Sequence, residues 1–157
     1  MINNDVLRSI RYMLDLSDNQ LIEIIHLVDP GFEISREDIQ GFLKKDEEDE
    51  GFIECSNPVL ARFLEGLVIH FRGRDPSQPQ RPIEKRVSNN VVLKKLRVAF
   101  ELKDVDMHEI FDSVGFPVSK PELSALFRAP GHKNYRQCGD QMLRNFLKGL
   151  TLRFRGA

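Results

Sequence analysis

The sequence predicts an all-α protein in which one small four-helix module occurs twice in tandem and the two modules pack together. Two observations lead to this prediction. Apolar residues recur with the 3.6-residue period of amphipathic helices, and residues 89–156 align with residues 3–73 with only short gaps in loops. We therefore expect a first module over residues 1–74, a linker over 75–87 and a second module over 88–157. Each module alone is marginal in size, which favours packing of one against the other.

The tandem copies share landmarks that keep one order along the chain. The landmarks of the first copy, each followed by its counterpart, are Asn3-Asn4 and Asn89-Asn90, Gly31-Phe32 and Gly115-Phe116, Cys55 and Cys138, Phe63 and Phe146, and Phe71-Arg72-Gly73 and Phe154-Arg155-Gly156. Chance does not align so many landmarks in one order. Features kept in both copies are most simply explained by folding, so features found in one copy are the better candidates for function.

The first helix of each module is predicted by an apolar stripe. Between Val6 and Leu14 the apolar residues recur at i, i+3, i+4 and i+7, which places them on one helical face. Asn4 and Asp5 are both suited to cap this helix. The second copy repeats the stripe from Val92 to Phe100, so both modules are expected to begin with a helix.

Capping residues mark the second and third helices. Ser17 or Asp18 is suited to start the second helix, and Pro30-Gly31 ends it. Ser35 is suited to cap a short third helix, because an acidic residue follows three positions later, as in a capping box. Ser119 occupies the same position in the second copy.

The fourth helix of each module ends on a cation and a glycine. In the first copy it starts after Ser56-Asn57-Pro58, where proline suits the first turn, and it ends at Arg72-Gly73. In the second copy it ends at Arg155-Gly156. The linker that follows the first module contains three prolines with Ser and Gln, and it is expected to be semi-extended.

The composition is ordinary for a soluble globular protein, with 157 residues, of which 41% are hydrophobic and 30% charged. The longest apolar stretch, Phe63–Phe71, is interrupted by Glu65 and is far shorter than a membrane-spanning helix, so no membrane partner is expected. The N-terminus lacks the features of a secretory signal. We therefore expect a cytoplasmic protein in which Cys55 and Cys138 are reduced thiols.

Charge is divided unevenly between the halves of the chain. Residues 1–74 contain 8 Lys and Arg against 15 Asp and Glu, a net charge of −7, whereas residues 75–157 contain 15 against 9, a net charge of +6. This asymmetry is consistent with a nucleic-acid or acidic partner for the second half. It is equally consistent with docking of the two halves on each other, or with no functional role, because most surface charge serves solvation.

Three segments carry a family resemblance. They are residues 3–16 (Asn-Asn-Asp-Val-Leu-Arg-Ser-Ile-Arg-Tyr-Met-Leu-Asp-Leu), residues 50–55 (Glu-Gly-Phe-Ile-Glu-Cys) and the Lys-Lys-Asp-Glu-Glu-Asp segment from residue 44. They resemble the YehS-like family of small bacterial proteins, and the resemblance covers essentially the whole chain, including its duplication. It implies a cytosolic bacterial protein of a domain-of-unknown-function family. It supplies no activity, cofactor or catalytic residue.

An acidic run distinguishes the first copy and consists of Asp46, Glu47, Glu48, Asp49 and Glu50. Asp46, Glu48 and Glu50 would occupy positions 1, 3 and 5 of a calcium loop, but position 12 is Asn57, where a bidentate Glu is required. We therefore interpret the run as a solvated acidic loop that is able to contact a partner. No bound metal is expected.

A basic set distinguishes the second copy and consists of Lys120, Arg128, Lys133 and Arg136, all able to neutralise phosphates. These residues follow a Gly-Phe turn that is similar to the turn of a helix-turn-helix, whose second helix enters the major groove of DNA. Pro121 inside the third helix and a bulky phenylalanine at the helix crossing count against this motif.

The sequence gives little indication of a zinc site, a nucleotide-binding site or a catalytic site. The four histidines do not recur at equivalent positions and lack the i, i+4 partners of a helical zinc site. No P-loop, Gly-x-Ser-x-Gly or GxGxxG motif appears. One ion pair is expected in each module, between Arg11 and Glu23 and between Arg97 and Glu109.

These features order three hypotheses about function. The first is a non-catalytic binding or adaptor protein without a cofactor, which binds a protein partner through a groove between the modules or through the acidic face of the first. The second is a nucleic-acid-binding regulator that uses the basic second module. The third is a small-molecule or metal-dependent enzyme. We predict that the protein is not an enzyme.

Overall fold

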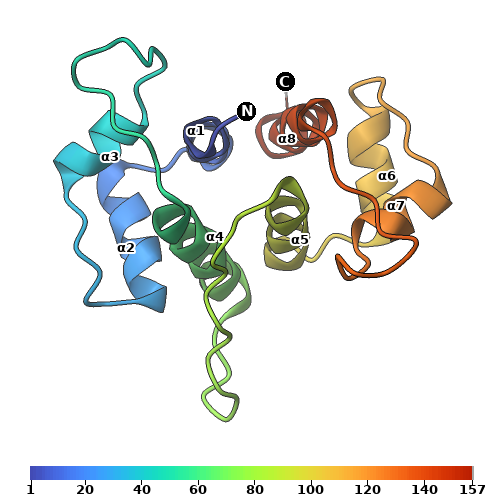
Figure 1. Cartoon of the computed structure of the whole chain (residues 1–157), viewed down its shortest axis with the longest axis horizontal. Coiled ribbons are helices and arrows are strands. Elements are labelled where there is room, and N and C mark those ends of the chain that lie inside the picture. The colour runs from blue at the N-terminus through green and yellow to red at the C-terminus, as the bar shows by residue number, and fades with distance from the viewer. Residues whose placement is uncertain (157) are drawn as a thin grey trace. The chain divides into compact units, whose positions relative to one another are not determined.

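The computed structural model describes residues 1–156, which contain eight α-helices and no strand (Figure 1). The chain divides into two compact units, residues 1–87 and residues 88–157. The first unit contains α1 (Asn3–Leu14), α2 (Asp18–Val28), α3 (Arg36–Phe42) and α4 (Asn57–Arg72). The second unit contains α5 (Asn89–Ala99), α6 (Asp104–Asp112), α7 (Lys120–Leu126) and α8 (Asp140–Arg155). The predicted all-α fold with two four-helix modules is confirmed.

The serines predicted as helix caps are confirmed. The hydroxyl oxygen of Ser17 accepts a hydrogen bond from the Gln20 amide at 3.2 Å. The hydroxyl oxygens of Ser35 and Ser119 accept equivalent bonds at 3.1 and 3.2 Å, and an acidic side chain three residues later accepts from the serine amide in return. These reciprocal bonds satisfy amides that have no partner inside the short helices α3 and α7.

The predicted cap of the first helix is wrong. The N-cap of α1 is Ile2, whose amide donates to the Asp5 carboxylate at 2.9 Å. Asn4 lies inside the helix, and its side chain bonds to distant backbone groups instead. The position equivalent to Ile2 in the second unit is Ser88, whose hydroxyl oxygen accepts from the Val91 amide at 3.2 Å.

The longest helix of each unit lies at the centre of that unit's core. α2 packs along α4 in the first unit, and α6 packs along α8 in the second. The side chains buried most completely in the first unit include those of Leu7, Ile10, Leu21, Ile25, Ile39, Leu60, Phe63, Leu64 and Leu67. Their counterparts in the second unit include Leu93, Leu96, Phe111, Leu143, Phe146 and Leu150. None of the helices in residues 1–156 is long and apolar enough to cross a membrane.

A glycine lies at the closest helix crossing of each unit. A Cβ atom added to Gly66 of α4 would lie 2.2 Å from the carbonyl oxygen of Ile24 in α2. A Cβ atom added to Gly149 of α8 would lie 2.4 Å from the carbonyl oxygen of Ile110 in α6. Separations this short are prevented by van der Waals repulsion, so both crossings require glycine. The close approach explains why both copies keep this residue.

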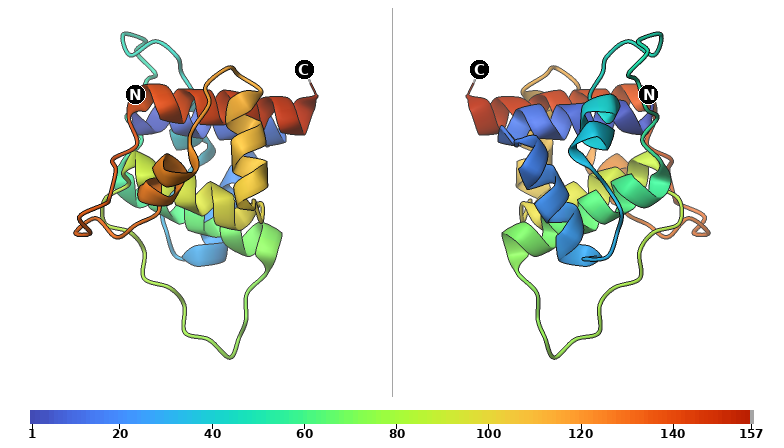
Figure 2. Two further views of the ribbon diagram at one scale, coloured as in Figure 1. Left: turned by 90° about the vertical axis from the view of Figure 1, so that its right-hand side faces the viewer. Right: turned by 90° about the vertical axis from the view of Figure 1, so that its left-hand side faces the viewer.

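The linker between the modules contains no helix or strand over residues 73–88, yet it bonds to the first unit. The guanidinium of Arg74 donates to the carbonyl oxygen of Leu27, and the side-chain amide of Gln80 donates to that of Val28 at 3.0 Å. Between these two anchors the chain extends past the end of α4 before it turns back (Figure 2). The linker therefore has a defined path against the first unit.

Substitution of Gly149 tests the crossing of α6 and α8. We expect Gly149→Ala to lower the free energy of unfolding by about 2 kcal/mol, because overpacking at the Ile110 carbonyl outweighs the better helix propensity of alanine. Urea unfolding followed by circular dichroism measures the change. Gly131→Ala in the loop between α7 and α8 is the control, since no atom lies within 4 Å of the added Cβ. Equal unfolding midpoints for the two variants would contradict the crossing as described.

Candidate functional site

The acidic run and most of the basic set occupy the same place in their respective units. Residues 43–56 connect α3 to α4, and residues 127–139 connect α7 to α8. Each connection is the longest between two helices of one unit. In Figure 1 the loop between α3 and α4 extends away from the four helices of its own unit. These loops are the candidate sites, because their tips differ between the copies while their bases are alike.

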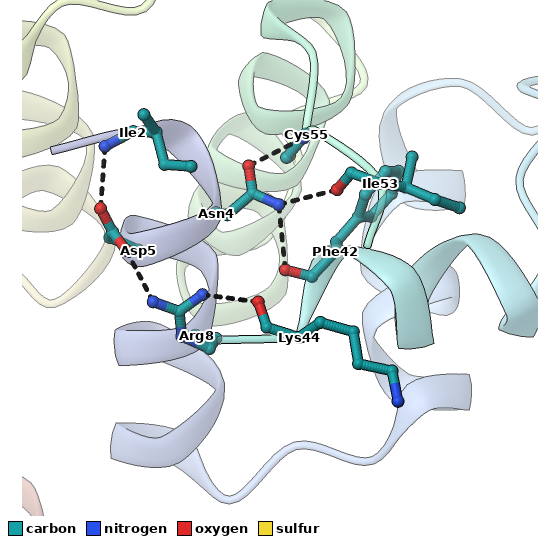
Figure 3. A network of polar contacts seen from close by, with 8 residues as sticks. All are labelled: Ile2, Asn4, Asp5, Arg8, Phe42, Lys44, Ile53 and Cys55. Atoms are coloured by element: carbon teal, nitrogen blue, oxygen red, sulfur yellow. Dashed lines mark hydrogen bonds and ion pairs between the residues drawn. The ribbon is translucent and has the colours of Figure 1, made fainter. Parts of the chain in front are cut away.

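The base of the first loop is held by Asn4, whose side chain is fully buried (Figure 3). Its Nδ2 donates to the carbonyl oxygens of Phe42 at 3.1 Å and Ile53 at 2.8 Å. Its Oδ1 accepts from the Cys55 amide at 2.9 Å. One side chain of α1 therefore joins the end of α3 to the segment that leads into α4.

The base of the second loop is held in the same way by Asn90. Its Nδ2 donates to the carbonyl oxygens of Leu126 at 3.0 Å and Arg136 at 2.8 Å, and its Oδ1 accepts from the Cys138 amide at 2.8 Å. We call these two sets of bonds the asparagine clamps. Because the clamps occupy equivalent positions, they belong to the fold that both copies share.

The asparagine that precedes each clamp adds a second set of bonds. Nδ2 of Asn3 donates to the carbonyl oxygen of Cys55 at 3.1 Å and to the side-chain oxygen of Asn57 at 2.9 Å. Nδ2 of Asn89 donates to the carbonyl oxygen of Cys138 at 3.0 Å and to the Asp140 carboxylate at 2.8 Å. The shared Asn-Asn pair therefore fixes the start of the fourth helix in both units.

The five carboxylates of the acidic loop, residues 46–50, are all exposed. The Asp46 carboxylate accepts from the Glu48 amide at 2.9 Å, and the Asp49 carboxylate accepts from the Gly51 amide at 2.8 Å. Two acidic side chains thus stabilise the turns of their own loop. Within residues 1–156, no group of three or more His, Cys, Asp or Glu side chains is arranged to hold a metal ion.

The basic set is only partly free to meet a partner. Lys120, Arg128 and Lys133 are exposed, whereas Arg136 forms an ion pair with Glu122 of α7. Hydrogen bonds from the Ser119 amide and from Arg136 hold the pKa of the Glu122 carboxyl below its ordinary value. Glu122 is therefore ionised at neutral pH, and it neutralises one of the four cations.

The helix that a helix-turn-helix would insert into DNA is short in this protein. α7 has seven residues, and its Leu123 and Leu126 are buried in the core of the second unit. The exposed residues of the helix are Lys120, Pro121 and Ser124. One exposed cation and no exposed amide side chain leave this helix poorly equipped to read bases.

The two shared cysteines are free thiols buried beside the clamps. Burial raises the pKa of Cys55 to about 12 and that of Cys138 to about 11. Both thiols are therefore protonated at neutral pH and poor nucleophiles. Their burial destabilises the folded state as the pH rises through about 9, where the thiols of the unfolded chain ionise and the buried ones do not.

The predicted ion pair between Arg97 and Glu109 is wrong. Arg97 instead pairs with Asp104 at 2.5 Å and donates to the Leu102 carbonyl oxygen at 3.1 Å, so it fixes the turn between α5 and α6. Glu109 pairs with Arg153 of α8 at 3.4 Å. In the described part of the first unit, the corresponding Arg11 and Glu23 do not form an ion pair with each other either.

Sequence reasoning missed an ion pair beneath the linker. The side chain of Glu65 in α4 is only 4% exposed, and its Oε1 lies 2.9 Å from Nε of Arg81 in the linker. Both residues line a cavity of about 520 Å³ between α4 and the linker. The available signal was the acidic residue inside an apolar helix, at a position where the second copy has the exposed Lys148.

Removal of one clamp tests the scaffold of the second loop. We expect Asn90→Ala to lower the free energy of unfolding by about 3 kcal/mol, because two carbonyl groups and one amide lose their partner in a buried site. Urea unfolding of the full chain measures the loss. Asn145→Ala is the control, since this side chain bonds only within α8, and it should change stability by less than about 0.5 kcal/mol. Equal stabilities for both variants would rule out the clamp as a major contribution.

Comparison with known proteins places this fold in a family. A family model described as "Protein of unknown function (DUF1456)" matches residues 3–73 and again residues 89–156. Over 153 residues, the chain is 48% identical to "Uncharacterized protein YehS" of Escherichia coli (strain K12), an alignment that covers 98% of this chain and 96% of that protein. No solved structure matches. The resemblance seen in the sequence is confirmed, and the chain belongs to the DUF1456 family of proteins of unknown function, with the family model matched once in each module.

Proposed function

We propose that this protein is a non-catalytic binding protein whose acidic loop docks a basic segment of a protein partner. The observation that carries the proposal is the state of the five carboxylates at residues 46–50. All are exposed, and none forms an ion pair with another described residue. Lys44 and Lys45 precede them, so the segment 44–50 has a net charge of −3.

The clamp beneath the loop favours this role. Asn4 fixes both ends of the loop to α1, and Arg8 donates to the Lys44 carbonyl oxygen at 3.1 Å beside the tip (Figure 3). A loop with fixed ends loses less conformational freedom on binding than a free chain does. Its uncompensated charges attract a basic partner over a distance set by ionic strength. The loop thus combines a rigid base with an accessible charged tip.

A role without catalysis agrees with how the shared polar residues are used. Asn3, Asn4 and their counterparts are occupied by bonds that build the loop bases. The shared thiols are buried with raised pKa values. We accordingly propose a cytoplasmic adaptor that works without a cofactor, and an enzyme remains the third hypothesis.

Nucleic-acid binding is the second candidate. Lys120, Arg128 and Lys133 are exposed, and the half of the chain that contains them has a net charge of +6. Three cations on one short helix and one loop favour phosphate contacts over base recognition. Binding of this kind would weaken steeply with salt and show little preference for sequence.

Neutralisation of the acidic loop tests the leading proposal. We compare the wild type with a variant that carries Asp46→Asn, Glu47→Gln, Glu48→Gln, Asp49→Asn and Glu50→Gln. Asn retains the oxygens that stabilise the turns, so the loop should keep its conformation. Affinity purification from cells that produce the protein natively, with nuclease present, should recover a protein partner. The loop variant should bind the purified partner at least about tenfold more weakly, because several charge pairs are lost together.

The matched control neutralises five exposed acids elsewhere on the first unit, through Asp15→Asn, Glu23→Gln, Glu33→Gln, Glu37→Gln and Glu54→Gln. This variant has the same change in net charge and should retain the partner. Equal loss in both variants would show that net charge matters and the loop does not. Recovery of partners only without nuclease, and their loss on substitution of Lys133 and Arg128, would favour nucleic-acid binding instead.

A further inference from the structure

We propose that the cavity between α4 and the linker binds a small organic carboxylate, which the guanidinium of Arg81 holds. The cavity has a volume of about 520 Å³, which lies in the range of small-molecule sites. It lies in the first unit, away from the acidic loop, so the inference is independent of the function proposed above.

Arg81 is oriented by a buried carboxylate. Its Nε donates to Oε1 of Glu65 at 2.9 Å, and the Glu65 side chain is 4% exposed, whereas that of Arg81 is 54% exposed. The terminal nitrogens of Arg81 donate to no other described residue. A guanidinium held through Nε retains both of its terminal NH₂ groups for an anionic ligand. Glu65 is thus a positioning residue for Arg81.

The path of the linker also builds the wall of the cavity. Arg74, near the start of the linker, donates to the Leu27 carbonyl oxygen. Gln80, next to Arg81, donates to the Val28 carbonyl oxygen at 3.0 Å. Because both segments are bonded to the end of α2, the wall is formed before any ligand arrives. A preformed site loses less entropy on binding.

The lining of the cavity selects a singly charged anion. Two cations, Arg74 and Arg81, line it together with two acids, Glu65 and Asp75, so the formal charges cancel. A carboxylate adds one negative charge and matches the planar fork of a guanidinium. A phosphate monoester would add nearly two charges beside the existing acids, which is less favourable.

Three apolar side chains favour an apolar body for the ligand, and Gln78 and Gln80 line the cavity beside them. Ile69 of α4 and the linker residues Pro79 and Pro82 line the cavity. These side chains favour a short hydrocarbon chain over a polar one. The second unit has Lys148 in place of Glu65, so the arrangement that orients Arg81 belongs to the first unit.

Titration of the full ¹⁵N-labelled chain with hexanoate tests the proposal, with amide chemical shifts as the readout. Hexanoate should bind with a dissociation constant on the order of a millimolar and shift the amides of Ile69, Gly73, Gln78 and Arg81 in a saturable manner. Hexanamide, which has the same chain without the charge, should produce no saturable shift. Phenyl phosphate should bind at least about threefold more weakly than hexanoate.

Three variants assign the binding to Arg81. Arg81→Gln should weaken hexanoate binding at least about tenfold, because a charged hydrogen-bonded contact is lost. Arg81→Lys can keep the ion pair with Glu65 but has no fork, so it should weaken binding about threefold or more while the linker stays in place. Arg86→Gln removes an exposed linker arginine that does not line the cavity and should bind like the wild type.

The outcomes separate clearly. Saturable hexanoate shifts in the cavity that weaken in both Arg81 variants and persist in Arg86→Gln would support the site. Absence of saturable shifts in the wild type up to about 20 mM hexanoate, or equal binding by wild type and Arg81→Lys, would overturn it. Equal shifts by hexanamide and hexanoate would also overturn it, since the arginine would then have no role.

Discussion

A buried asparagine side chain near the start of each unit, Asn4 or Asn90, satisfies the last carbonyl group of the third helix and two backbone groups of the irregular connection that follows it. Backbone groups buried without a partner would each cost about 1–3 kcal/mol. The clamp therefore lets a long connection pass through the interior at its base while its tip remains in solvent. The base and the tip of this loop therefore have different roles. The base stabilises the fold, and the residues of the tip can change without disturbing the fold.

A comparison of the two copies shows a conserved loop base beneath a variable loop tip. Their clamps agree bond for bond, yet one tip carries five carboxylates and the other carries Arg128 and Lys133. The glycine at each helix crossing has a similar effect, since Gly66 and Gly149 fix the approach of two helices through backbone contact alone. The core and the loop bases are thus alike in the two copies, and the exposed loop tips carry opposite charge.

Local patterns predicted most of the fold, because periodicity and serine caps depend on residues a few positions apart. The role of Asn4 and the partner of Arg97 were not predictable in this way. Asn4 bonds to an amide 51 residues away, so its role appears only after the chain has folded. The charge difference between the copies pointed to the two candidate loops. It did not indicate that Arg136 pairs with Glu122. The Glu65 site was missed because its partner lies in a linker whose prolines do not specify its path.

The clamps are the central claim, and native-state hydrogen exchange tests them most directly. The amides of Cys55 and Cys138 are bonded to buried asparagine oxygens, so they should exchange only when their unit unfolds. The amides of Glu47 and Lys133, at the exposed tips of the same loops, should exchange rapidly. If the two cysteine amides exchange as fast as the tips do, the loop bases open independently of the fold, and the account of a fixed base with a variable tip is contradicted.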